Sequence, residues 1–157
     1  MEALAALGAS SPAILLRGSP TAYLLVNAAH VLGIGLLIGA IVTLDLRLLG
    51  AFAAHPLAHL GPPLRRMAMA GLGLAAATGA LLFSTRPLAY VENPAFLAKM
   101  ALLGLALLNV ALLHAGPRWR DAMAGGTPHA RLRAAALVSL LAWPGVLLAG
   151  RWIGFLQ

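Results

Sequence analysis

Residues 27–50 are NAAHVLGIGLLIGAIVTLDLRLLG, an apolar run with His30 near its start and Asp45 and Arg47 near its end. A helix of about 20 residues crosses the roughly 30 Å of hydrocarbon in a bilayer, so this run is long enough to span a membrane. The bilayer core penalises each polar side chain by a few kcal/mol unless it has a partner. The three polar residues are therefore candidate functional or helix-joining groups.

The whole chain shares this apolar character. Of its 157 residues, 61% are hydrophobic and only 10% are charged, and the mean hydropathy is +0.91, far from the usual composition of soluble domains. Cysteine is absent, which excludes disulfides, thiolate ligands and cysteine nucleophiles. The formal net charge of +7 does not indicate nucleic-acid binding, because basic residues at the ends of apolar spans ordinarily set topology and no basic-aromatic patch accompanies them.

Four segments are long and apolar enough to span the membrane. They cover roughly residues 23–49, 64–84, 94–114 and 132–155. All four should be helices, since an open strand cannot satisfy its backbone groups in lipid, and their short connections make neighbours antiparallel. We therefore predict an all-α polytopic membrane protein, an antiparallel four-transmembrane-helix bundle within residues 20–157, preceded by a short interfacial segment over residues 1–19.

Proline and glycine mark the expected ends of these spans. Gly61-Pro62-Pro63 precedes the second span, and Arg86-Pro87 follows it. Asn93 and Pro94 have the pattern of an N-cap followed by proline at the first helical position. Gly116-Pro117 closes the third span.

Basic residues are unevenly distributed between the two sides of the predicted bundle. The first and third loops carry Arg47, Arg65, Arg66, Arg118, Arg120, Arg131 and Arg133, whereas the other side has only Arg17, Arg86 and Arg151. The positive-inside rule then predicts a multi-pass membrane protein whose first and third loops lie in the cytoplasm, with both termini on the outer side. Lys99, the remaining basic residue, lies within the third span.

Depth along the helices decides which polar side chains are able to meet. His30 lies roughly 10–15 Å below the outer end of its helix and Lys99 roughly 8 Å below the same side, so both belong to the outer third of the membrane. His114, 20 residues past Pro94, lies about 30 Å further in and belongs to the cytoplasmic end. One metal ion bound by both histidines is therefore not expected.

His30 has two interpretations. Its imidazole either forms an interhelical hydrogen bond, which is common between membrane helices, or binds a ligand. Asn27 one turn before and Gly33 one turn after lie near its face and would let a flat ligand approach. Gly35 and Gly39 form a G-x-x-x-G pattern on roughly the opposite face, which predicts packing with a second copy or a partner membrane subunit.

Lys99 also has two interpretations. Its ammonium either extends to the interface along its alkyl chain, or lies desolvated and serves as a metal ligand or as the partner of an anion. Arg86 and Arg151 add cations at the same outer level, where anchoring at the interface explains them equally well.

The remaining polar residues are more typical of structural roles than of a catalytic or metal-binding site. Asp45 and Arg47 are two positions apart on a helix and do not face each other, so Asp45 is expected to meet Arg65, Arg66 or His114 in a polar cluster that joins helices at the inner end. His55 and His59 have an i, i+4 spacing, but Pro56 lies between them in a predicted loop. Solvated loop histidines are the favoured interpretation over a zinc pair.

Two of these segments resemble a known group of proteins. HVLGIGLLIGAIVTLDLRLLG (30–50) and NPAFLAKMALLGLALLNVALLH (93–114) look like an uncharacterised family of small bacterial four-helix membrane proteins. More distantly, they are similar to the copper-resistance-D membrane domain and the HemJ-type protoporphyrinogen oxidases. In the HemJ-type proteins an early histidine of the first helix and an early lysine of the third are associated with b-type haem, which the resemblance transfers to His30 and Lys99.

The sequence thus leads to one main hypothesis and two alternatives. The main one is a dimeric membrane protein that holds haem b and transfers electrons or performs a haem-linked oxidation near the outer face. His30 would be the axial metal ligand, Lys99 a second ligand or propionate partner, and Arg86 and Arg151 propionate partners. The alternatives are a copper or small-solute transport protein, although Met67, Met69, Met100 and Met123 do not form one thioether site, and an accessory subunit of a larger membrane complex.

Overall fold

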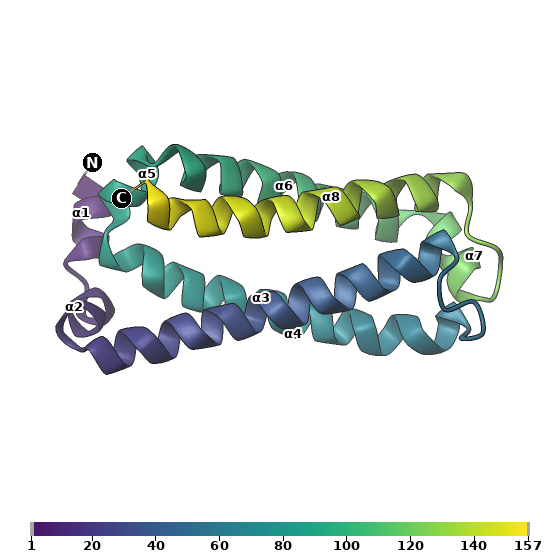
Figure 1. Ribbon diagram of the computed structural model, residues 1–157, viewed down its shortest axis with the longest axis horizontal. Helices are drawn as coiled ribbons and strands as arrows, with labels where there is room; N and C mark the ends of the chain where they lie inside the picture. The colour runs from purple at the N-terminus through teal and green to yellow at the C-terminus, as the bar shows by residue number, and fades with distance from the viewer. Residues whose placement is uncertain (1, 157) are drawn as a thin grey trace.

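Four long helices form the body of the protein in the computed structural model, which describes residues 2–156 (Figure 1). They are α3 (Pro20–Leu49), α4 (Leu57–Thr85), α6 (Pro94–Ala115) and α8 (Ala130–Trp152). Each is long and apolar enough to cross a membrane, and the chain is an all-α, multi-pass membrane protein, as predicted. Met1 and Gln157, at the outer limits of the two predicted segments, lie outside the described residues.

Short helices cover the two ends of the bundle. They are α1 (Glu2–Gly8), α2 (Ser11–Gly18), α5 (Pro87–Glu92), α7 (Pro117–Met123) and the 3-10 helix η1 (Ile153–Phe155). Helices α1, α2 and α5 lie at the end that also holds both chain ends, here called the terminal end (Figure 1). Helix α7 and loop 50–56 lie at the opposite end, here called the loop end.

The predicted helix ends agree with the structure at three of the four long helices. Ser19 caps α3 by accepting a hydrogen bond from the Ala22 amide, and α3 ends at Gly50, whose φ of 112° is left-handed. Asn93 caps α6 by accepting from the Ala95 amide at 2.9 Å, with Pro94 in the first turn as expected. The second span is the exception.

Helix α4 begins at Leu57, not at residue 64, and runs through Pro62 and Pro63. A proline removes a backbone donor and so leaves the carbonyl four residues earlier without its helical partner. Here those carbonyls belong to residues 58 and 59, in the first turn at the loop end, where water is able to satisfy them. The Gly61-Pro62-Pro63 boundary prediction was therefore wrong, because the first turns of a helix tolerate proline when they lie outside the hydrocarbon.

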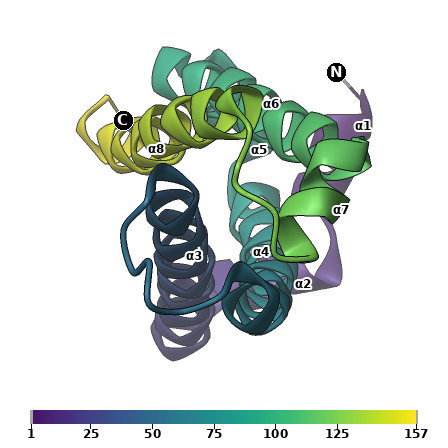
Figure 2. The same cartoon turned by 90° about the vertical axis from the view of Figure 1, so that its right-hand side faces the viewer.

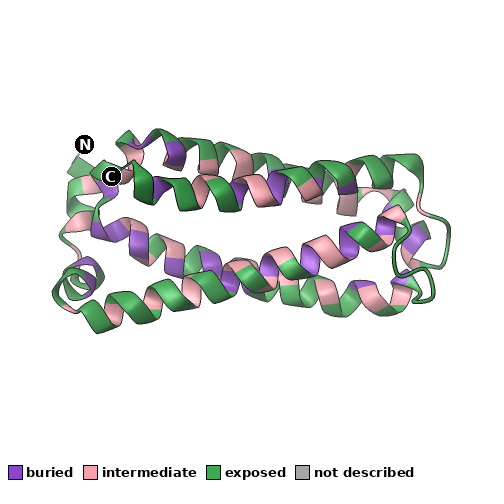
Figure 3. Ribbon diagram, viewed as in Figure 1, coloured by how far each residue is buried: buried purple, intermediate pink, exposed green. Residues whose placement is uncertain are grey.

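The long helices pack as two pairs. Helices α3 and α4 pack along each other, α6 and α8 do the same, and the contact of α3 with α8 joins the pairs, which Figure 2 shows end-on. One hydrophobic cluster fills the middle of the bundle and a second fills the loop-end half. They include Leu37, Ile41, Ala106 and Trp143 in the middle, and Leu44, Leu48, Trp119 and Leu132 towards the loop end. The outward helix faces are mostly exposed (Figure 3), as expected for surfaces that meet lipid.

The α3–α4 pair depends on a direct backbone contact. A Cβ atom built on Gly33 would lie 2.7 Å from the Ala75 amide nitrogen, and one built on Gly71 would lie 2.6 Å from the Leu37 nitrogen and 2.7 Å from the Gly33 carbonyl oxygen. Two helix backbones approach this closely only where side chains are missing. The α4 backbone therefore occupies the space beside Gly33. The sequence-based expectation that Gly33 leaves room for a flat ligand beside His30 was wrong.

Arg17 fixes the N-terminal helices to the bundle. Its guanidinium donates to the Thr85 carbonyl at 3.0 Å and to the Gly8 carbonyl at 2.7 Å. These carbonyls end α4 and α1, where the last turn of a helix leaves acceptors unsatisfied. One side chain thus satisfies two helix ends and holds α1 and α2 across the terminal end.

Replacement of Arg17 by methionine is expected to detach α1 and α2 while the four long helices stay folded. Two charge-assisted hydrogen bonds are lost, each worth about 1.5–3 kcal/mol. Hydrogen–deuterium exchange should rise across residues 2–18 and remain unchanged in α3 to α8. Arg66→Met, a change at an exposed arginine, is the matched control. Unchanged exchange in Arg17→Met would contradict this role.

Candidate functional site

His30 lies in the terminal half of α3 and is half-buried against α4. Its Nδ1 is 3.0 Å from the Thr78 Oγ1. The ring also packs on Gly79, where a Cβ atom would come within 3.0 Å of His30 Cε1. Thr78 and Gly79, adjacent in α4, therefore fix the position of the imidazole.

The hydrogen bonds of Thr78 assign the tautomer of His30. The Thr78 hydroxyl carries a single hydrogen, and its Oγ1 lies 2.6 Å from the Leu74 carbonyl oxygen, to which it donates. In that arrangement His30 Nδ1 donates to Thr78 Oγ1, and the lone pair of the neutral ring is on Nε2. The ring also interacts with the Ala75 backbone. Metal-binding histidines are typically oriented in this way, by a bond from the nitrogen that does not bind the metal.

Lys99 lies in the terminal half of α6 and packs against α8. A Cβ atom on Gly150 would lie 3.5 Å from both Cδ and Cε of Lys99 and 3.8 Å from its Nζ. The absence of a side chain at Gly150 thus gives the lysine chain room beside α8. The Lys99 ammonium is also close enough to His30 to act on it electrostatically. The structure therefore brings these two residues, from different helix pairs, into one region.

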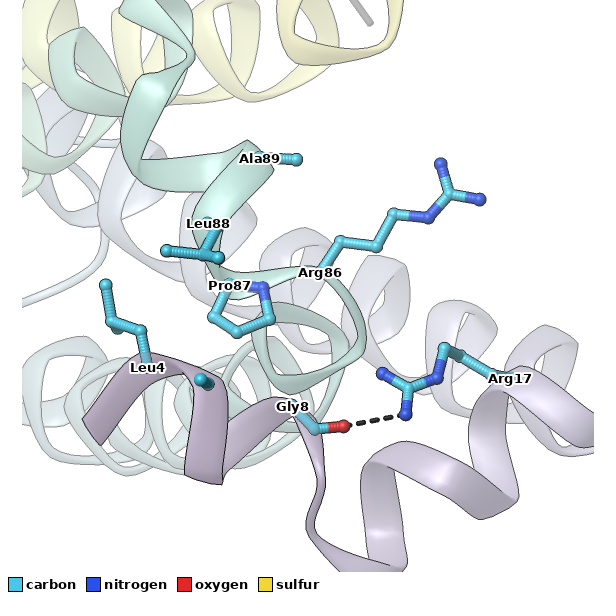
Figure 4. Close-up of a pocket in the computed structure, with 8 residues that line it drawn as sticks. Leu4, Gly8, Arg17, Arg86, Pro87, Leu88 and Ala89 are labelled. Atoms are coloured by element: carbon cyan, nitrogen blue, oxygen red, sulfur yellow. Dashed lines mark hydrogen bonds between the residues drawn. The ribbon is translucent and has the colours of Figure 1, made fainter. Parts of the chain in front are cut away.

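The other predicted cofactor-binding residues are spread around this region. Asn27 is exposed on α3. Arg151 is exposed, with its guanidinium 5.9 Å from the centre of the Phe155 ring. Arg86, at the junction of α4 and α5, is exposed and lines a surface pocket of about 320 Å³ together with Arg17 and residues of α1 (Figure 4). In Figure 4 its guanidinium points away from Gly8.

The predicted polar cluster at the inner end is not formed. Arg47, near the end of α3, donates to the carbonyl of His55, in loop 50–56, at 2.7 Å. His114 bonds the Val110 carbonyl of its own helix at 2.8 Å, and its ring lies at a tilted angle against Trp119, with ring centroids 4.3 Å apart. Within residues 2–156 no ion pair involves Asp45, which lies beside Ser139 of α8 instead. The prediction that Asp45 joins helices through Arg65, Arg66 or His114 was therefore wrong.

The remaining histidines do not form a metal site with their neighbours. His59 belongs to α4 rather than to a loop, whereas His55 precedes that helix. His129 caps α8 by accepting from the Arg131 amide. Across residues 2–156 there is no group of three or more His, Cys, Asp or Glu side chains able to hold a metal ion.

The methionines do not form one site either. Met67, Met69 and Met100 are exposed large hydrophobic residues. The sulfur of Met123 lies against Gly61, 2.8 Å from where a Cβ atom of that residue would be. The structure thus adds no support for a thioether copper site.

The residues beside the two central side chains, namely Thr78, Gly79 and Gly150, were not predicted from the sequence. The position of Thr78 along its helix could have identified it as a partner of His30. It lies seven residues before the end of α4 at Thr85, about 10 Å from the terminal end, and hence at nearly the depth estimated for His30. Comparison of depth for hydroxyl groups as well as charged groups would have paired them.

In comparisons with known proteins, no family model, curated protein or solved structure matches the chain.

Proposed function

We propose that the protein is a membrane b-type haem protein that transfers electrons, or takes part in a haem-linked oxidation, with His30 as axial ligand. The observation that carries this proposal is the hydrogen-bonded series from His30 Nδ1 through Thr78 to the Leu74 carbonyl. It leaves Nε2 as the free nitrogen and fixes the ring. Haem supplies one-electron redox chemistry when bound, and the protein's part is to bind and orient it.

Other features of the terminal half fit such a group. The two hydrophobic clusters of the core lie in the middle and in the loop-end half, away from His30 and Lys99. Helices α4 and α6 contact each other mainly near the terminal end, where Phe83 of α4 stacks on Phe96 of α6 with ring centroids 5.4 Å apart. A flat apolar cofactor between the helix pairs would leave the two core clusters intact and would lie beside the aromatic pair of Phe83 and Phe96.

Lys99 is assigned one of two roles in this proposal. Its amine either binds the iron as a second ligand or, as an ammonium, pairs with a haem propionate. Arg151 and Arg86 are exposed at the terminal end and are available to propionates, which prefer the interface. The resemblance to HemJ-type proteins supports His30 and Lys99 as the central pair.

Orientation and assembly complete the proposal. The excess of arginine at the loop end supports a cytoplasmic position for that end, and so an outer position for the terminal end and for the haem, in a bacterial inner membrane. Gly35 and Gly39 are exposed, and Cβ atoms built there would meet nothing within 4 Å. This open small-residue surface supports a helix contact with a second copy or a partner subunit.

An absorption spectrum of the purified protein tests the proposal. We expect a Soret band in the oxidised state, and a shifted Soret band with resolved visible bands after reduction. The protein should be produced with haem precursor supplied and, in parallel, titrated with haemin in detergent. No Soret band in the purified protein, together with no saturable haemin binding, would overturn the proposal.

Replacement of Thr78 by valine is expected to weaken haem binding about 10- to 100-fold, because partners that orient a metal-binding histidine have effects of this size. Valine keeps the shape of threonine but cannot accept the bond from His30. The matched control is Thr43→Val, since the Thr43 hydroxyl likewise donates to its own helix, at the Gly39 carbonyl, but is distant from His30. Haemin titration compares the two variants, and equal affinities would contradict the role of Thr78.

A further inference from the structure

Asp45 is an acidic side chain buried within a membrane span. The chain has four acidic residues, and Glu2, Glu92 and Asp121 are exposed, whereas Asp45 is only 5% exposed. It lies between the two hydrophobic clusters, one turn after Ile41 of the middle cluster and one turn before Leu49, which packs on the cluster towards the loop end. Polar side chains at such positions mark functional sites by default.

Asp45 has a buried polar neighbour on α8. Ser139 lies beside the carboxyl and is 3% exposed. Neither Asp45 Oδ2 nor Ser139 Oγ has a hydrogen-bond partner of ordinary geometry. Buried polar groups are rarely left unsatisfied in this way, and two adjacent ones indicate an incompletely filled site.

The charged groups of the surrounding helices do not neutralise Asp45. On its own helix, Arg47 bonds the His55 carbonyl. On α4, Arg65 acts electrostatically on His114 of α6. On α8, the polar neighbour of the carboxyl within residues 2–156 is Ser139, which carries no charge. An isolated carboxylate in apolar surroundings is prohibitively costly, so the site must carry either a metal cation or a proton.

The surroundings favour the proton. Hard metal cations in proteins take six or more oxygen ligands, and Ser139, the polar side chain beside the carboxyl, supplies one hydroxyl. Donors suit a protonated carboxyl, whose carbonyl oxygen accepts a hydrogen bond while its own hydrogen is shared with a neighbour or a buried water.

We propose that Asp45 and Ser139 form a proton-binding site inside the membrane, at the contact that joins the two helix pairs. Asp45 is 15 residues after His30 in the sequence, about 22 Å along α3, so this site is independent of the proposed haem. Loss of the proton would leave an uncompensated charge between α3 and α8. Proton release is therefore coupled to loosening of that contact.

Infrared spectroscopy of the full-length protein tests the site, in a detergent without ester groups so that carboxylic acid bands are visible. We expect a protonated carboxyl C=O band at neutral pH that is lost in Asp45→Asn and retained in Asp121→Asn, a change at an exposed acid. Absence of the band, or its persistence in Asp45→Asn, would overturn the proposal. So would a band that disappears on addition of sodium or potassium, since a metal cation would then be the ligand.

Ser139→Ala provides a second test that does not depend on folding of the Asp45 variant. Loss of the neighbouring hydroxyl should shift the C=O band to higher frequency without removing it. The control is Ser84→Ala, because the Ser84 hydroxyl is engaged by the Leu81 carbonyl of its own helix. A band unmoved by Ser139→Ala would exclude Ser139 from the site. A band that moves equally in both variants would do the same.

Discussion

Replacement of His30 by alanine is expected to abolish the Soret band of the purified protein. The iron would lose the one nitrogen whose orientation is fixed by Thr78 and Leu74, and alanine offers no ligand in its place. Imidazole added to the variant should restore the band, because the removed ring leaves space between α3 and Gly79. The measurement is the absorption spectrum at matched protein concentration, with and without imidazole.

His114→Ala is the matched control for this experiment. His114 is also a half-buried histidine of a membrane span, and its Nδ1 bonds the Val110 carbonyl of its own helix, whereas His30 Nδ1 bonds the Thr78 hydroxyl of α4. It lies at the loop end beside Trp119, and its loss should leave the haem spectrum unchanged. A Soret band that survives in His30→Ala, or that disappears in His114→Ala instead, would exclude His30 as the axial ligand.

The second large effect is expected at the crossing of α3 and α4. Gly71→Ala places a methyl group where the backbone of α3 already lies, within 2.6 Å of the Leu37 nitrogen. Because backbone atoms cannot move aside without separating the helices, we expect a loss of about 1–3 kcal/mol of stability. Thermal unfolding in detergent, followed by circular dichroism, measures it.

Gly73→Ala is the control, one half-turn away on the same helix. Gly73 is exposed and a Cβ atom there would meet nothing within 4 Å, so alanine should raise helix stability by up to about 1 kcal/mol. The two variants carry the same chemical change and should move the unfolding temperature in opposite directions. Equal shifts would show that the close approach at Gly71 does not hold the pair together.

Sequence reasoning located the membrane helices well because their signals are local. Apolar length defines all four spans, and capping residues such as Ser19 and Asn93 act on the amides that directly follow them. The start of α4 was missed because the effect of Pro62 and Pro63 depends on where the membrane surface lies. That position is a property of the whole bundle and not of the neighbouring residues.

The candidate site was only partly predictable for a related reason. Helical rise gives depth, and depth alone placed His30 and Lys99 in one layer of the membrane. It does not give the rotation of one helix about its axis relative to another. Rotation decides that Thr78 of α4 bonds the His30 ring, and that Asp45 faces Ser139 instead of an arginine. Such pairings follow from the packing of glycines such as Gly71, which no single helix specifies.

The hydrogen bond from Arg17 to the Thr85 carbonyl also has a consequence for biosynthesis. The two residues are 68 positions apart in the chain, and domains form as the chain is synthesised from its N-terminus. Helices α1 and α2 leave the ribosome before the acceptor at the end of α4 exists, so they cannot take their final position until the second span has been made. The N-terminal helices therefore dock only after both helices of the first pair, α3 and α4, have been made.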